Sequence, residues 1–160
     1  MRMARNVLLL VAVFVLQTTW VQVVEVAGMA PDLVMLVLVA IALGRGVVEA
    51  TLLGFGVGFL QDVHMPDDLG LNALANSLVG FGAGYCRTRV EADSLPVQVA
   101  LVVGAVAARD LVFYVGSSAI SLPAAPLLWL RYSVGRALYT GAVTALLAAG
   151  LTTWRRRFAL

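Results

Sequence analysis

The chain has 160 residues, of which 61% are hydrophobic and 12% are charged, and its formal net charge is +2. This composition lies far outside that of soluble globular domains. Every basic residue is an arginine, and so small a net charge gives no sign of nucleic-acid binding.

Long apolar runs, separated by short charged loops, follow one another along the chain. They cover Val7–Val24, Leu33–Leu60 with a break at Gly44–Gly46, Leu69–Tyr85, Leu95–Val115 and Leu127–Trp154. A helix of about 20 residues crosses a hydrocarbon core, and backbone amides in lipid are satisfied only within helices or closed barrels. No segment alternates between apolar and polar residues over the length of a barrel strand. The chain is therefore predicted to be an all-α integral membrane protein.

We predict one domain of six transmembrane helices over residues 1–160. The expected spans are 7–25, 31–45, 47–62, 69–86, 95–116 and 126–154. Pro31 and Pro96 support this division, because proline is tolerated in the first turn of a helix. The first run follows basic residues, as a signal peptide does, but it is longer than a typical signal core and no small-x-small cleavage site follows. We expect it to remain as the first span.

The arginines outside the spans indicate the topology, because short loops rich in Lys and Arg stay in the cytoplasm. They are Arg2, Arg5, Arg45, Arg87, Arg89, Arg155, Arg156 and Arg157. The intervening loops carry only acidic charges, namely Glu25, Asp32, Asp62, Asp67 and Asp68. Counted alternately, these loops predict six spans with both termini in the cytoplasm.

The second and third spans are short. Pro31 to Arg45 is roughly 22 Å long at 1.5 Å per residue, less than a hydrocarbon core. Two short spans would let Arg45 and Glu49 extend to the interface, whereas a re-entrant hairpin would hold Arg45 deep in the membrane at a high energetic cost. We favour two short spans.

Two stripes of small and amide residues recur at a spacing of four on the third and fourth helices. The stripes are Gly54, Gly58 and Asp62 on one helix, and Asn72, Asn76, Gly80 and Gly84 on the other. Such stripes let membrane helices approach closely, and the amides can hydrogen-bond across the contact. We favour packing inside the helix bundle, with docking of a partner helix as the alternative.

Four ionisable residues fall inside the last two spans. They are Arg109, Asp110, Arg131 and Arg136. Charges at such depth are usually paired or functional, and Asp62, Asp110 and Glu25 are candidate partners for the arginines. We expect internal ion pairs that fix the register of the helices. The alternatives are contact with a partner protein and binding of an anionic group such as a lipid phosphate.

No residue pattern predicts catalysis or a cofactor. The loop from Asp62 to Asp68, with His64, has side chains that suit a metal, but a loop of this composition is more often simply solvated. No nucleophile elbow, phosphate loop, cysteine pair or HExxH motif occurs. We therefore expect neither an enzyme, nor a cofactor, nor a metal site.

Residues 30–89 contain an ordered series of short motifs. They are Ala30-Pro31-Asp32-Leu33, Gly44-Arg45-Gly46, Gly54-Phe55-Gly56-Val57-Gly58-Phe59-Leu60-Gln61-Asp62, Leu69-Gly70-Leu71-Asn72-Ala73-Leu74, and the loop with Arg87 and Arg89. This series resembles the rod shape-determining protein MreD family of the bacterial inner membrane. The second half of the chain matches only in hydropathy and in Arg136.

The resemblance implies a non-enzymatic scaffold of the cell-elongation machinery. Its expected partner is an MreC-like bitopic membrane protein, which links it indirectly to an MreB-like filament and to a peptidoglycan polymerase–transpeptidase pair. Membrane lipids are expected contacts, and self-association is left open. The family also looks similar in fold to the six-helix S-components of energy-coupling-factor transporters. The alternative function is therefore that of a vitamin-binding transporter component, with Arg109, Arg136 and Asp62 lining a pocket.

Overall fold

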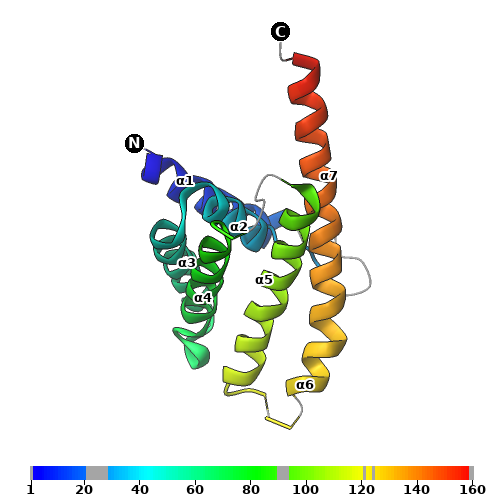
Figure 1. Cartoon of the computed structure of the whole chain (residues 1–160). Coiled ribbons are helices and arrows are strands. Elements are labelled where there is room, and N and C mark those ends of the chain that lie inside the picture. Colours follow the sequence, from blue (N-terminus) through cyan, green and yellow to red (C-terminus); the bar gives the residue numbers. More distant parts are fainter. Residues whose placement is uncertain (1, 21–28, 90–93, 121, 124, 159–160) are drawn as a thin grey trace.

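The computed structural model describes residues 2–20, 29–89, 94–120, 122–123 and 125–158, and all its regular structure is helical. Its elements in chain order are α1 (Arg2–Trp20), α2 (Leu33–Arg45), α3 (Val47–Asp62), the short 3-10 turn η2 (Pro66–Asp68), α4 (Leu71–Cys86), α5 (Leu95–Gly116), α6 (Ala125–Leu128), the π-helical turn η3 (Trp129–Ser133) and α7 (Val134–Phe158). Because α6, η3 and α7 follow without a break, these described segments form six rods (Figure 1).

The observed helices agree in part with the expected spans. The bounds of α3 and α5 are those predicted, whereas α1 already begins at Arg2, and residues 21–25 of the first predicted span lie outside the described part of the chain. By length and composition, α5 is the one described helix that is long and apolar enough to cross a membrane, and Met3–Thr19 and Leu33–Arg45 are shorter apolar helices. The six-span topology therefore stays a prediction.

Local signals in the sequence explain where α2 begins and ends. The Asp32 carboxylate accepts a hydrogen bond of 3.0 Å from the Met35 amide, which caps the first turn. Gly46 has a φ of +95°, a conformation that side chains rarely allow, and it lies between the end of α2 and the start of α3. The chain therefore reverses direction at Gly46, directly between α2 and α3.

The two ends of the bundle differ in charge. Asn6 in α1 donates a hydrogen bond of 2.7 Å to Glu49 in α3, and a Cβ atom at Gly46 would lie 3.4 Å from an Arg87 terminal nitrogen. These contacts bring the start of α1, the α2–α3 turn and the end of α4 together at one end of the bundle, which we call the arginine end because Arg45 and Arg87 lie there. The turn between α2 and α3 therefore lies at the same level as the end of α4. The choice between two short spans and a re-entrant hairpin stays a prediction.

The opposite end, which we call the aspartate end, contains Asp62 and Asp68. The Asp62 carboxylate accepts hydrogen bonds of 2.9 Å from the Asn72 and Ala73 amides, so the last residue of α3 caps the first turn of α4. An anion at a helix N-terminus satisfies free amides and complements the helix dipole. Figure 1 shows the connection between α5 and α6 at the end of the bundle opposite to the C-terminal end of α7.

Helices α3 and α4 pack backbone to backbone through the two stripes. A Cβ atom at Gly54 or Gly58 would collide with the Asn76 or Asn72 carbonyl, and one at Gly80 would collide with the Ala50 carbonyl. Gly84 faces the Val47 backbone in the same way. Both stripes are therefore covered by the contact between α3 and α4 within the chain.

Helix α2 lies at the centre and contacts α1, α3, α4, α5 and α7. Its buried residues, with Leu53, Val57, Val102 and Val106 from the neighbouring helices, form the hydrophobic core. Many large hydrophobic side chains lie instead on the outside of the rods, including Leu8, Phe55, Phe81, Leu138 and Leu146. So much exposed apolar surface is typical of a protein whose solvent is lipid.

We predict opposite effects for two neighbouring glycines of α3. Gly58→Ala should lower the free energy of unfolding by about 1–3 kcal/mol, because its methyl group meets rigid backbone rather than a movable side chain. Gly56→Ala meets nothing within 4 Å and should be neutral or raise stability by up to about 1 kcal/mol, since alanine is the better helix former. Unfolding by SDS in mixed micelles, followed by circular dichroism, measures both. Equal effects of the two changes would contradict the backbone contact.

Candidate functional site

Four charged side chains from three helices meet near the aspartate end. Arg136 of α7 donates to Asp32 at the start of α2 at 2.8 Å and to Asp110 of α5 at 3.4 Å. Arg109 of α5 lies 3.2 Å from Asp110 and 3.7 Å from Asp32. The four form one closed network of two cations and two anions, with a net charge of zero.

Neutral polar groups complete this charge network. Arg109 donates a hydrogen bond of 2.7 Å to the Asn72 side-chain oxygen of α4, and the Asp32 amide donates one of 2.9 Å to the Thr140 hydroxyl of α7. Asp32 is also hydrogen-bonded to the Gln17 side chain. The network therefore joins every rod of the bundle except α3.

Burial makes the network important for stability. The side chains of Asp32 and Asp110 are 1% and 5% exposed, and that of Arg109 is 11% exposed. Charges removed from water are stabilised only when they are paired with good geometry, and removal of one partner leaves an uncompensated buried charge. These residues can therefore fix the register of α2 against α5 and α7.

The structure brings together some of the predicted charged residues and separates others. Arg109, Asp110 and Arg136 meet, as described above, but Arg131 is exposed and lies over the Tyr132 ring at 5.5 Å. Asp62 caps α4 rather than pairing with an arginine, because it ends α3 directly against the free amides of α4. Glu25, the third candidate partner, lies outside the described residues.

Asp32 is the member of the charge network that the sequence analysis missed, because it was treated there only as an acidic residue of a loop. In the structure it has two arginine partners from distant segments. Its position after Pro31, where an apolar helix begins, was the one available signal. Pairing with Arg136 requires contact across 104 residues of chain, which no local pattern reports.

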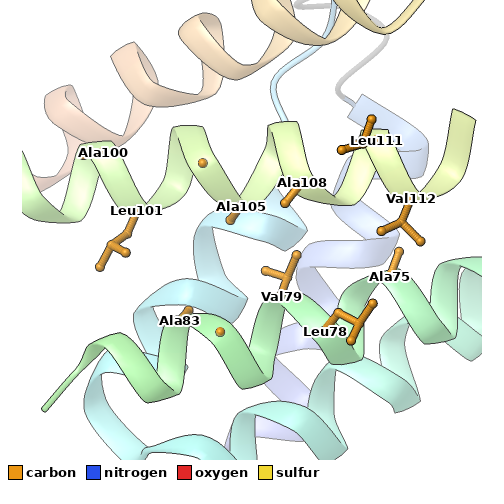
Figure 2. A pocket seen from close by; sticks show the side chains of 12 residues that line it. Ala75, Leu78, Val79, Ala83, Ala100, Leu101, Ala105, Ala108, Leu111 and Val112 are labelled. Atoms are coloured by element: carbon orange, nitrogen blue, oxygen red, sulfur yellow. The ribbon is translucent and has the colours of Figure 1, made fainter. Parts of the chain in front are cut away.

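A second feature is an apolar groove between α4 and α5, with a volume of about 410 Å³ (Figure 2). Small side chains line much of it: Ala75, Gly82 and Ala83 from α4, and Ala100, Gly104, Ala105 and Ala108 from α5. A Cβ atom at Gly82 or Gly104 would meet nothing within 4 Å. Unlike the stripes of α3 and α4, this groove has no occupant among the described residues. The spacing of four from Ala100 to Ala108 is a signal that could have predicted it.

The loop with His64 serves as a connection between α3, α4 and α5. Asp68 accepts hydrogen bonds of 2.6 Å from the Ser117 hydroxyl, 2.8 Å from the Ser118 amide and 2.9 Å from the Ser118 hydroxyl. His64 packs against the Phe14 ring, with the ring centroids 6.1 Å apart. Among the described residues, no three His, Cys, Asp or Glu side chains group as a metal would require.

Comparison with known proteins identifies one family. The family described as MreD, rod shape-determining protein MreD, matches residues 2–149 of the chain. No curated protein and no solved structure matches. The similarity in fold to the S-components of energy-coupling-factor transporters therefore stays a prediction.

We predict that Asp32→Asn strongly destabilises the fold. Asparagine can still cap α2, so the change removes the charge while retaining the cap. The free energy of unfolding should fall by about 3–5 kcal/mol, because Arg109 and Arg136 are left with one carboxylate between them. The exposed Asp67→Asn is the matched control and should change little. Thermal unfolding in detergent compares them, and equal stability of the two variants would show that the network does not hold the helices.

The contact at Asp68 should depend on pH. The Ser117 hydroxyl, and then the Ser118 amide and hydroxyl, hold the pKa of Asp68 below its usual 3.8. A lowered pKa means that the contact contributes stability above that usual value and loses it as the pH falls through the folded-state pKa. Hydrogen exchange at the Ser118 amide should therefore lose protection below pH 3.8. Asp68→Asn should lack this step, and a step of the same size in both proteins would refute the assignment.

Proposed function

The chain belongs to the MreD family of rod shape-determining proteins, and we propose that it acts as a non-enzymatic membrane scaffold of the bacterial cell-elongation machinery. The observation that carries this proposal is the family match, which extends over residues 2–149. Membership implies a bacterial membrane protein with a role in rod-shape determination. The buried charge network supports a scaffold, because its side chains pair with one another.

The proposed topology places the arginine end in the cytoplasm. Short loops rich in arginine are retained there, and the start of α1, the α2–α3 turn and the end of α4 all lie at that end. The six rods would then be six spans of the inner membrane, with the aspartate end facing the periplasm. Short helices such as α2 are accommodated by local thinning of the bilayer.

The proposed partner is an MreC-like bitopic protein whose single membrane helix lies in the groove between α4 and α5. Helices associate in lipid through close packing and a few hydrogen bonds, and small residues permit the closest approach. The glycine stripes of α3 and α4 are already filled, whereas Gly82 and Gly104 face open space. The groove is therefore the better candidate for the contact.

Through this partner, the protein would connect two layers of the elongation machinery. An MreB-like filament lies on the cytoplasmic side, and a peptidoglycan polymerase–transpeptidase pair acts outside. A helix held in a groove keeps its own soluble domain at a fixed place relative to the scaffold. We do not extend the proposal to vitamin transport, because the charge network is neutral and offers no excess positive charge to an anionic vitamin.

We predict that Gly104→Ile releases the partner helix. The added side chain would fill part of the groove, and loss of close packing should weaken association by about 1–3 kcal/mol, or roughly 5- to 150-fold. Co-purification of a tagged MreC-like partner from native membranes measures this.

Gly56→Ile is the matched control, because Gly56 also faces open space but lies on α3, outside the groove. It should retain the partner. Release by Gly56→Ile together with retention by Gly104→Ile would place the partner elsewhere on the bundle. Retention by both would remove the groove from the interface, while leaving the family assignment intact.

A further inference from the structure

Two cavities open beside the charge network at the aspartate end. One, of about 240 Å³, is lined by Asp110, Phe113, Tyr114 and Arg136, and the other, of about 220 Å³, by residues that include Gln17, Gln61 and His64. Both are also lined by Met65, Asn72 and Arg109. The larger has room for roughly eight water molecules at about 30 Å³ each, which is enough for a small polar group.

The larger cavity is lined by both hydrogen-bond donors and acceptors that have no partner within the network. Arg136 uses one N–H of each terminal nitrogen, toward Asp110 and Asp32, out of the five that a guanidinium carries. Its side chain is 30% exposed and lines the cavity. Among the described residues, both hydrogen bonds to Asp110 end on Oδ1, so that Oδ2 remains for a further donor.

Charge balance decides which kind of group fits this cavity. The network already contains two cations and two anions, so an added anion would leave a net negative charge in a medium of low dielectric constant. A group that carries one positive and one negative charge keeps the site neutral. It can accept from Arg136 and donate to Asp110 at the same time.

We propose that this cavity binds the headgroup of a zwitterionic phospholipid with a primary ammonium, that is, of the phosphatidylethanolamine class. The phosphate would accept from Arg136, and the ammonium would donate to Asp110. Arg109 and Asp110 lie about 10 Å before the end of α5 at Gly116, by the rise of 1.5 Å per residue, so the headgroup would have to enter the bundle from the aspartate end. The inference rests on the proposed membrane topology and is independent of the MreC-like partner.

Lipid binding to the purified protein tests this assignment. The protein is extracted from vesicles with equal amounts of phosphatidylethanolamine, phosphatidylcholine and phosphatidylglycerol, and bound lipid is identified by native mass spectrometry. Phosphatidylethanolamine should be enriched about tenfold, because phosphatidylcholine lacks N–H donors and phosphatidylglycerol adds a net charge. Equal retention of all three, or a preference for phosphatidylglycerol, would overturn the proposal. So would tighter binding of soluble phosphoethanolamine than of the lipid, which would identify a free solute as the ligand.

Two variants separate the site from general surface charge. Asp110→Asn gives the network a net positive charge and should shift the preference toward phosphatidylglycerol. Arg131→Gln removes an exposed arginine of the same rod, outside the cavity, and should leave the preference as it is. An equal shift in both variants, or none in a folded Asp110→Asn protein, would overturn the assignment. Should Asp110→Asn fail to fold, the lipid preference of the unaltered protein still tests the proposal. Partner capture by the unaltered protein reports separately on the proposed function.

Discussion

Charge neutrality inside an apolar bundle is the constraint on which the arrangement of helices depends. Asp32, Arg109, Asp110 and Arg136 come from three helices, and none of them can be left without a partner at low cost. The observed register of α2 against α5 and α7 brings the four within contact distance. Hydrophobic packing alone would allow these apolar helices to slide, because lipid is as apolar as their side chains.

Close backbone contact is the second constraint, and it acts in the other half of the molecule. The glycines of α3 and α4 let the two backbones meet, and the Asp62 carboxylate fixes the level of one helix against the other. Close packing in this half depends on glycines, whereas the contact of α5 with α7 also includes ion pairs. The hydrogen bond from Arg109 of α5 to Asn72 of α4 is one of the contacts that join the two halves.

Local patterns in the sequence predicted most of the helices but only part of the site. Apolar runs end at charges, glycine and proline, so the bounds of α3 and α5 followed directly. Arginines within the last two predicted spans indicated internal ion pairs, because charge is costly in lipid. The choice of partner could not follow, because Asp62 and Asp32 are both acidic residues at helix ends. Which of them reaches an arginine depends on the packing of distant helices, and so does the open groove beside α4.

Helix α5 carries the two candidate sites on opposite faces. With 3.6 residues per turn, Ala100, Gly104 and Ala108 share one face, and Val106 and Asp110 lie on the other. A partner helix in the groove would therefore contact α5 without entering the charge network. The network in turn holds α5 against α2 and α7, and would thereby preorganise this wall of the groove. A preorganised surface loses less conformational entropy on binding, so that close packing against small residues costs the partner helix less.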